Sequence, residues 1–156
     1  KGWGCHLRQP LFHNLTHYED NKFTPVGLRV TYAINSWYLI KDNPILGVGT
    51  GDFPSEYSRI NKLYPTSQPD TTNPHNMYVL VLVQTGLIGL ISMLSIFYYQ
   101  IKLSFRSDNR FIRDAGIALP LLFLILMWSD SYILGHFTTL MFVFFGSFLY
   151  KDFEKT

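Results

Sequence analysis

The chain has 156 residues, of which 47% are hydrophobic, 17% aromatic and only 15% charged. Soluble globular domains carry about 25% charged residues, so this composition favours a membrane protein. The formal net charge of +2 is small and the positive residues are dispersed along the chain, which argues against a nucleic-acid partner.

Cys5 is the single cysteine, so no disulfide can form within the chain. Together with His6, His13 and His17 it could bind zinc, and His13 and His17 would share one face of a helix. The segment nevertheless has none of the spacings typical of zinc sites, such as Cys-x-x-Cys or His-Glu-x-x-His. We therefore expect no metal and no other cofactor.

The first predicted helix covers about residues 26–41. Apolar residues recur there at steps of three and four and form a stripe along one helical face. Pro25 and Gly27 mark the start, and Asn43-Pro44 marks the end. The stripe consists of Val30, Ala33, Ile34, Trp37 and Ile40.

Arg29 lies in the first turn of this predicted helix, where a cation gains nothing from the helix dipole. Its charge must therefore be satisfied elsewhere. From the helix alone, a solvated surface arginine is the common explanation.

A glycine-rich segment follows, from Gly47 to Phe53, with glycines at alternate positions. Glycine adopts backbone conformations that other residues avoid and allows a neighbouring segment to approach closely. A phosphate-binding P-loop would end in Gly-Lys-Ser/Thr, whereas this segment ends in Asp52-Phe53. It is therefore predicted to form a tight structural turn, and residues 68–74 are predicted to form a loop.

Residues 77–101 form a run of 25 positions without a charged side chain. At about 1.5 Å per residue, a helix of this length crosses a hydrocarbon layer of roughly 30 Å with some tilt. Gly86 and Gly89 lie three positions apart within it, a spacing that suits close packing of helices. We therefore predict a transmembrane helix over residues 77–101.

Pro74-His75-Asn76 stands directly before this span. An imidazole and an amide at the edge of a membrane are well placed for chemistry on a lipid-borne substrate. A polar pair before a span is also commonly just an interfacial helix cap. The position by itself therefore allows both a catalytic and a structural interpretation.

The region 115–150 contains one formal charge, Asp130, in 36 residues. A single helix of that length would be about 54 Å long, too long for one crossing. Asp130 therefore predicts the tip of a helical hairpin. We expect a turn at 129–131 between transmembrane helices at 111–128 and 132–150.

His136 lies in the outer third of the last predicted span, four residues after Tyr132. Ionisable residues inside a membrane are functional candidates by default. This one is close to the interface, where a neighbouring helix could satisfy it, so a structural role is the expected one.

The short loops set the orientation. Lys and Arg are concentrated in the loop at 102–110 and directly after it, and two lysines lie in the tail at 151–156, whereas the hairpin tip has none. By the positive-inside rule the loop and the tail are cytoplasmic, and residues 1–76 and the tip face the other side.

The predicted fold class is an all-α polytopic membrane protein. Three C-terminal transmembrane helices follow an extracytoplasmic loop region, residues 1–76, which contains an amphipathic helix. A long polar segment without a preceding span indicates the C-terminal part of a longer polytopic protein. The alternative is a protein whose polar N-terminal segment is translocated by its first span.

Several short motifs follow one another in a specific order. They are Gly27-Leu28-Arg29, Trp37, Asn43-Pro44-Ile45-Leu46-Gly47-Val48-Gly49-Thr50-Gly51-Asp52-Phe53, Pro74-His75-Asn76 and Gln84-Thr85-Gly86-Leu87-Ile88-Gly89-Leu90. In this combination the chain resembles the O-antigen ligase family, which shares its signature region with O-antigen polymerases and some protein O-oligosaccharyltransferases. The resemblance covers residues 25–150.

The resemblance implies a multi-pass glycosyltransferase of the bacterial inner membrane with its active face in the periplasm. Such enzymes take a glycan from undecaprenyl diphosphate, and the ligases transfer it to a sugar hydroxyl of the lipid A core, without nucleotide sugar or metal. The expected partners are the lipid-linked glycan donor, a lipid A-core or other glycan or protein acceptor, and membrane lipids. An O-antigen polymerase, a protein O-oligosaccharyltransferase and a non-catalytic truncated remnant are the alternatives.

The resemblance also implies site residues. Arg29 matches the family's loop arginine and His75 the histidine before the following span, so both are expected to be catalytic. A guanidinium offers paired donors to the phosphate oxygens of a departing diphosphate, so Arg29 is also a substrate-binding residue. An imidazole can accept the proton of an attacking hydroxyl. Asn76 is expected to orient His75 or to bind sugar.

Overall fold

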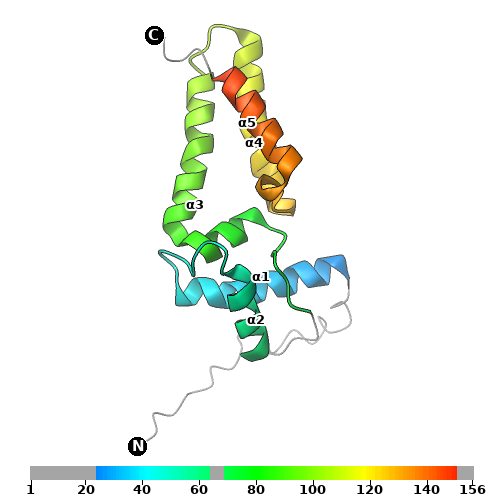
Figure 1. Ribbon diagram of the computed structural model, residues 1–156. Coiled ribbons are helices and arrows are strands. Elements are labelled where there is room, and N and C mark those ends of the chain that lie inside the picture. Colours follow the sequence, from blue (N-terminus) through cyan, green and yellow to red (C-terminus); the bar gives the residue numbers. More distant parts are fainter. Residues whose placement is uncertain (1–23, 64–68, 151–156) are drawn as a thin grey trace, which may run out of the picture.

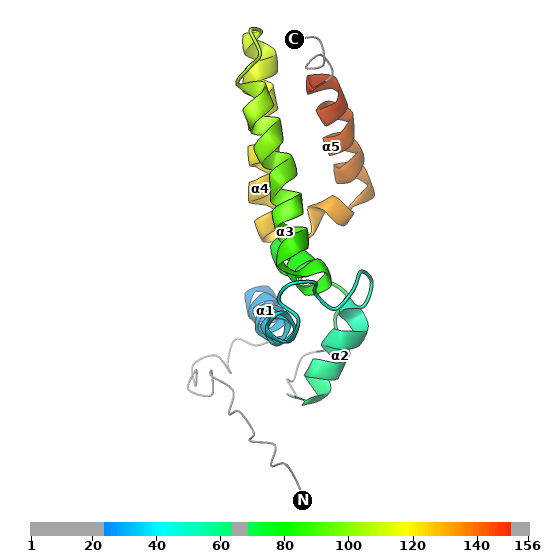
Figure 2. The same ribbon diagram turned by 90° about the vertical axis from the view of Figure 1, so that its left-hand side faces the viewer.

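The structure, a computed structural model, describes residues 24–63 and 69–150. Within these ranges every regular element is a helix, so the predicted all-α class is confirmed for this part of the chain. Three helices run along one another, and two lie beyond one end of this bundle, with α1 crosswise to it (Figures 1 and 2). The elements are α1 (Pro25–Asp42), α2 (Phe53–Leu63), α3 (Met77–Ser104), α4 (Arg110–Ser129), the short 3-10 helix η2 (Tyr132–Leu134) and α5 (His136–Leu149).

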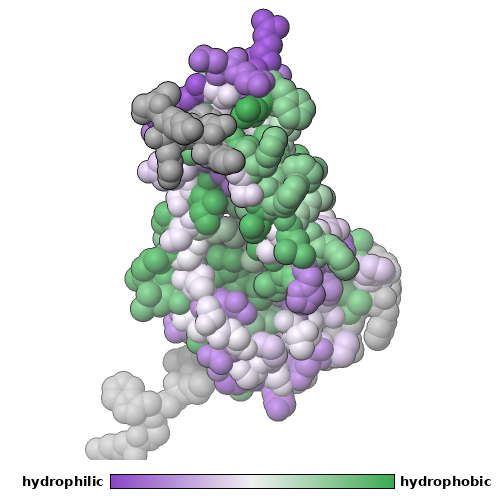
Figure 3. All heavy atoms as spheres, turned by 45° about the horizontal axis from the view of Figure 1, so that its top comes forward, coloured by the Kyte–Doolittle hydropathy of each residue, from purple (hydrophilic) through white to green (hydrophobic). Residues whose placement is uncertain are grey.

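Two of the described helices, α3 and α4, are long and apolar enough to cross a membrane. Only 17% and 22% of their most apolar stretches are buried, so most of their large side chains need a lipid-like surrounding, unlike the core helix of a soluble protein. Figure 3 shows these apolar side chains around the bundle, between more polar surfaces at its two ends. Together with the composition, this makes the chain a membrane protein.

The third predicted span, 132–150, is shorter than expected. The structure divides it into η2 and α5, and α5 has 14 residues, which corresponds to a length of about 21 Å. A hydrocarbon core of about 30 Å needs roughly 20 residues. The crossing of α5 therefore stays a prediction, as does the predicted periplasmic location of residues 1–76.

The helix predicted for residues 26–41 is present as α1, with Thr24 as its N-cap. However, the face that packs is not the apolar stripe. Several of the buried residues are small or polar, and Asn35, for example, donates to the hydroxyl of Tyr57 on α2 at 3.0 Å. Val30 and Trp37 of the apolar stripe lie exposed on the opposite side. The buried residues are Gly27, Thr31, Tyr32, Asn35, Ser36 and Leu39.

Helix α3 is broken at Gly86, whose φ of 64° and ψ of −161° are not helical. The break divides α3 into a short limb, residues 77–85, and a long limb, residues 87–104, and the chain turns sharply between them (Figure 1). The long limb has 18 residues, about 27 Å. The predicted continuous span over 77–101 is therefore wrong in shape, although its residues are helical on both sides of Gly86.

The loop after α1 satisfies the backbone groups that this break leaves without helical partners. In a membrane such groups cannot turn to water, so a broken helix is stable only where other groups replace the lost hydrogen bonds. Four backbone bonds do so. They run from Val48 N to Val83 O, Gly49 N to Gln84 O, Leu87 N to Pro44 O and Ile88 N to Ile45 O.

Glycines permit this contact. A Cβ on Gly86 would lie 2.2 Å from Ile45 O, and a Cβ on Gly47 would lie 2.4 Å from the Gln84 carbonyl carbon. Gly47 also has a positive φ of 71°, which L-residues other than glycine rarely adopt. The tight turn predicted for this segment is therefore confirmed. The helix-packing role predicted for Gly86 is wrong, because the glycine packs against a loop.

Aromatic rings join the three helices of the bundle. Phe142 of α5 lies between Phe97 of α3 and Phe123 of α4, with ring centroids 5.6 and 4.7 Å away. At the far end, the Tyr150 hydroxyl donates to Gly116 O at 2.7 Å. These contacts join α3, α4 and α5 into one bundle.

Candidate functional site

His75 has an unusual backbone conformation directly before α3. Its φ of 53° is the one positive φ among non-glycine residues in the described ranges. Such a conformation costs about 1–2 kcal/mol for an L-residue. It is held by Asn73, whose Oδ1 accepts from the His75 backbone N–H at 2.9 Å. Strain of this kind concentrates at functional sites, so the conformation makes His75 a candidate functional residue.

The imidazole of His75 contacts the hairpin tip. His75 Nδ1 lies 3.1 Å from Asp130 Oδ1, and the two side chains are 43% and 36% exposed. Asp130 Oδ1 also accepts from the Ser131 backbone N–H at 2.7 Å. A carboxylate can only accept, so Nδ1 is the protonated nitrogen of the neutral ring, and Nε2 keeps its lone pair. Within the described ranges Nε2 has no hydrogen-bond partner, so in this tautomer its lone pair can serve as an acceptor.

Two asparagines strengthen the joint between the start of α3 and the hairpin tip. Asn73 Oδ1 accepts from the Ser131 hydroxyl at 2.7 Å in addition to its bond with His75. Asn76 caps α3 by accepting from Val79 N at 3.1 Å, and its Nδ2 donates to Trp128 O at 3.1 Å. Asn76 therefore does not hydrogen-bond the imidazole of His75; it fixes the backbone on both sides of the site.

Tyr32 of α1 covers one face of the imidazole. The two rings are stacked with centroids 6.2 Å apart and an interplanar angle of 27°. Tyr32 is buried and packs edge-on against Tyr57 of α2 at 5.9 Å. The imidazole is thus held by a carboxylate in its plane and by an aromatic ring on its face.

Arg29 lies exposed one helical turn before Tyr32. Residues three apart in a helix have Cβ atoms about 5–6 Å apart, so Arg29 is close to the residue that covers His75. No hydrogen bond joins Arg29 to His75, and Arg29 has no acidic partner in the part of the chain that the structure describes. By contrast, Arg59 pairs with Glu56 at 2.7 Å. The Arg29 side chain is thus exposed on α1 close to the residue that stacks on His75.

The segment that leads to His75 is also attached to α2. Asn61 Nδ2 donates to Asp70 Oδ1 at 2.8 Å. Hydrogen bonds from Ser58 and Asn61 lower the pKa of Asp70, so this carboxylate stays ionised at neutral pH. The site segment is thus held at Asp70 by α2 and at Asn73 by the hairpin tip.

Sequence reasoning missed Asp130, Asn73 and Tyr32 as site residues. Asp130 had a signal, because it is the one formal charge in region 115–150, but that signal was interpreted only as a turn. Tyr32 gave none. His136, at the start of α5, is exposed and has no hydrogen bond from its ring to a described residue, so it is not part of this site.

No three His, Cys, Asp or Glu side chains gather in a metal-binding arrangement within residues 24–63 and 69–150. The N-terminal residues weighed above as zinc ligands, Cys5, His6, His13 and His17, lie outside the described residues, as does the tail at 151–156.

The model of the O-antigen ligase family matches residues 7–94, more than half of the chain. The matched region contains Arg29, His75 and Asn76 and ends within α3, before Asp130. No curated protein and no solved structure matches the chain.

Proposed function

Because this chain belongs to the O-antigen ligase family, we propose that it transfers a glycan from undecaprenyl diphosphate to a sugar hydroxyl of the lipid A core. His75 acts as the general base and Arg29 binds the diphosphate. The reaction takes place at the periplasmic face of the bacterial inner membrane. The observation that carries the proposal is the hydrogen bond between His75 and Asp130.

The imidazole of His75 supports its role as the general base. Asp130 accepts from Nδ1–H, so Nε2 points its lone pair away from the carboxylate. Nε2 takes the proton of the acceptor hydroxyl while the oxygen of that hydroxyl forms a bond to the anomeric carbon of the glycan. The bond from this carbon to the diphosphate oxygen breaks, and its electron pair leaves with the diphosphate. Asp130 stabilises the imidazolium that forms.

The charge and the position of Arg29 support its role in binding the diphosphate. The leaving diphosphate gains negative charge, and a fixed guanidinium with paired donors stabilises that charge more in the transition state than in the ground state. Arg29 is exposed on α1, so a phosphate can reach its guanidinium from outside. Arg29 lies one turn of α1 before Tyr32, whose ring stacks on the imidazole of His75, so both proposed site residues belong to one region of the fold.

The distribution of Lys and Arg supports a periplasmic location of the site. The bundle end that carries the α3–α4 connection also carries Lys102, Arg106 and Arg110, and the positive-inside rule places it in the cytoplasm. The site lies at the opposite end, where the head group of a lipid carrier would be presented.

Complementation of a ligase-deficient strain tests this proposal. The complete protein that contains this chain is expressed as wild type, as Arg29→Ala and as His75→Ala. Arg59→Ala serves as the matched control, because Arg59 pairs with Glu56 on α2. Wild type and control are expected to restore capped lipopolysaccharide, and the two site variants are expected to fail. Full restoration by both site variants would contradict the assignment.

The acceptor separates the ligase from the two alternatives that share its donor chemistry. In a transfer assay with purified protein, we expect the product on lipid A core, not on a second lipid-linked glycan or a protein. Transfer to either of the latter would replace the ligase by a polymerase or a protein O-oligosaccharyltransferase. Expression of stable protein without any transfer would indicate a non-catalytic remnant.

A further inference from the structure

Two large apolar side chains are exposed in the loop that supports the break in α3. Ile45 is 62% exposed and Leu46 is 73% exposed, and their loop lies beside the bend of α3 (Figure 1). Single exposed apolar residues are ordinary on the surface of a soluble protein. In a chain with membrane-spanning helices, the depth of the loop relative to the hydrocarbon layer decides what these two side chains contact.

The far end of the long limb of α3 carries a marker of the membrane surface. Tyr98 and Tyr99 are exposed, and Lys102 Nζ lies 5.8 and 5.9 Å from the centroids of their rings. Tyrosines are enriched at the level of the lipid head groups, and lysines near helix ends extend their charge to that level. The hydrocarbon layer therefore ends close to residues 98–102.

The long limb is too short to cross the whole layer from this marker. Residues 87–101 contain no charge and extend about 22 Å as a helix, whereas the hydrocarbon core is about 30 Å thick. Any tilt of the limb shortens its reach further. The break at Gly86 therefore lies inside the layer, near the surface on the site's side.

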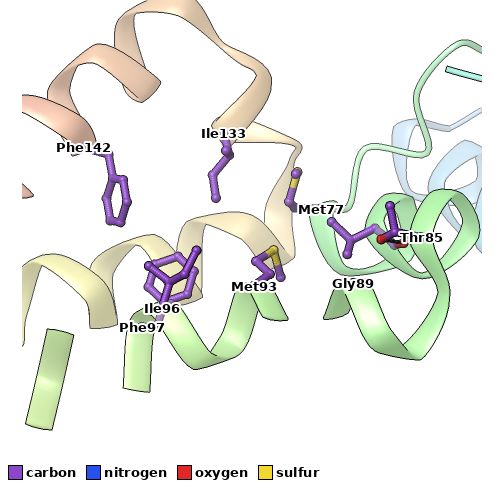
Figure 4. Close-up of a pocket in the computed structure, with 9 residues that line it drawn as sticks. Met77, Thr85, Gly89, Met93, Ile96, Phe97, Ile133 and Phe142 are labelled. Atoms are coloured by element: carbon purple, nitrogen blue, oxygen red, sulfur yellow. Dashed lines mark hydrogen bonds between the residues drawn. The ribbon is translucent and has the colours of Figure 1, made fainter. Parts of the chain in front are cut away.

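The inner side of the bend fits an apolar surrounding. Met77 of the short limb and Met93 of the long limb both line it (Figure 4). Among the lining residues, Thr85 has the one side-chain hydroxyl, and this hydroxyl donates to Val81 O at 2.8 Å. The inner side of the break thus exposes no free polar side chain, as expected within a hydrocarbon layer.

The 44–49 loop lies at the depth of this break, because backbone hydrogen bonds attach it to the first two residues of the long limb. Leu87 N donates to Pro44 O at 2.9 Å, and Ile88 N donates to Ile45 O at 3.3 Å. These bonds satisfy two carbonyls of the loop, and Pro44 has no N–H to satisfy. A loop enters hydrocarbon only where its backbone polar groups have partners in the protein, and these residues meet that condition.

We propose that the tip of this loop, Pro44-Ile45-Leu46, inserts between the phospholipid acyl chains of the leaflet on the site's side. The side chains of Ile45 and Leu46 then exchange water for hydrocarbon, which stabilises the inserted state. The insertion is shallow, because Asp42 and Asn43 directly precede the tip and keep to the level of the head groups. The proposal does not depend on glycan transfer.

Such an insertion also sets the level of α1. This helix ends at Asp42, just before the tip, and lies crosswise to the bundle (Figures 1 and 2). An inserted tip holds α1, with Arg29, along the membrane surface at the level of the head groups. The tip is thus a membrane anchor for a helix that does not itself cross the membrane.

Fluorescence quenching tests the depth of the tip. In a cysteine-free background of the complete protein, Leu46→Cys is labelled with the fluorophore NBD and reconstituted into phosphatidylethanolamine–phosphatidylglycerol vesicles. Ile88→Cys marks the start of the long limb, and Thr50→Cys, exposed on the same loop beyond the tip, is the matched control. We expect a phospholipid with a spin label near the top of its acyl chain to quench positions 46 and 88 about equally. Aqueous iodide should quench position 50 at least about twice as strongly as position 46.

Two outcomes of this measurement would overturn the proposal. Iodide quenching of position 46 as strong as that of position 50 would place the tip in water. Protection of position 46 from both iodide and the spin-labelled lipid would place the tip under another segment of the longer protein. Ile45→Cys repeats the measurement at the neighbouring side chain, so that the conclusion does not rest on one substitution.

Labelling of the unmodified protein avoids substitutions altogether. An apolar diazirine reagent that partitions into hydrocarbon is photolysed in the same vesicles, and the labelled residues are mapped. We expect label on Ile45 or Leu46 and on the long limb of α3, and none on α2, whose exposed residues are mostly polar. Label on the long limb without any on residues 44–46 would overturn the proposal.

Discussion

His75 and Asp130 are 55 positions apart in the sequence, and a hydrogen bond of 3.1 Å joins His75 Nδ1 to Asp130 Oδ1. One residue precedes α3 and the other follows α4, so the bond ties the start of one helix to the end of the next. The same bond fixes the tautomer and the orientation of the imidazole. This one hydrogen bond therefore both joins the two helix ends and orients His75 as a base.

Asp130 should therefore be required for the rate of glycan transfer. Asp130→Asn keeps the shape of the side chain but loses the charge that stabilises the imidazolium, and we expect kcat to fall on the order of 100-fold or more. KM for the donor should change little, because the carboxylate does not bind the diphosphate. Steady-state kinetics over a range of pH measure both quantities.

Asp114→Asn is the matched control for this substitution, because Asp114 lies exposed near the start of α4 and should tolerate the change. A variant at Asp130 with normal kcat and raised KM would show that the carboxylate binds substrate instead of positioning His75.

Arg29 should need its guanidinium and not only its charge. Lys offers a compact ammonium without the paired donors that match phosphate oxygens. We expect Arg29→Ala to lower kcat/KM by on the order of 100-fold and Arg29→Lys to recover only part of this loss. Kinetics with the lipid-linked donor, with Lys41→Ala as a control on the same helix, provide the measurement. Full activity of Arg29→Lys would reduce the role of Arg29 to general electrostatic attraction.

Gly86 should be sensitive to the addition of a single methyl group. The backbone conformation of Gly86, φ 64° and ψ −161°, costs a side chain about 1–3 kcal/mol, and the clash with Ile45 O adds about 1–3 kcal/mol of overpacking. Gly86→Ala should therefore lower the free energy of unfolding by about 2–6 kcal/mol, measured by thermal or denaturant unfolding in detergent.

Gly51 offers a control that separates these two effects. Its φ is also positive, 92°, but a Cβ there would meet nothing within 4 Å. Gly51→Ala should therefore show only the backbone cost. Equal destabilisation by the two substitutions would mean that the contact with the 44–49 loop contributes nothing measurable.

Tyr57 packs against Tyr32, and its hydrogen bond with Asn35 should stabilise the packing of α1 on α2. The Tyr57→Phe substitution removes the hydroxyl that accepts from Asn35, whose side chain is buried. An unsatisfied buried amide costs about 1–3 kcal/mol, and the free energy of unfolding should fall by that amount. The double variant Asn35→Leu with Tyr57→Phe should recover part of the loss, since neither polar group then remains. No recovery would attribute the effect to packing of the ring.

Local patterns predicted the helix at about 26–41, the turn at Asp130 and the tight glycine segment, because each depends on residues close together in the sequence. The break at Gly86 was not predictable in this way. A glycine in an apolar run leaves the hydropathy signal intact, and the break depends on hydrogen bonds from a loop about 40 positions earlier. The packing face of α1 was missed for a related reason: the polar Asn35 on this face is buried because its hydrogen-bond partner, Tyr57, lies on α2.

The pairing of His75 with Asp130 also required the fold. Each residue had a separate signal, a histidine before a span and a lone charge in a hairpin, but no pattern connects positions so far apart. The tertiary contacts of α3 with α4 bring them together.

The orientation of the chain can be tested without any substrate. In a Cys5→Ser background, Ser55→Cys places an exposed thiol on α2 near the site, and Asp108→Cys places one between α3 and α4. Because Lys102, Arg106 and Arg110 favour the cytoplasm for that connection, a membrane-impermeant thiol reagent should label position 55 in intact spheroplasts. Position 108 should be labelled only after the membrane is permeabilised. The opposite pattern would place His75 and Asp130 in the cytoplasm, away from the periplasmic donor, and the proposed reaction could not occur there.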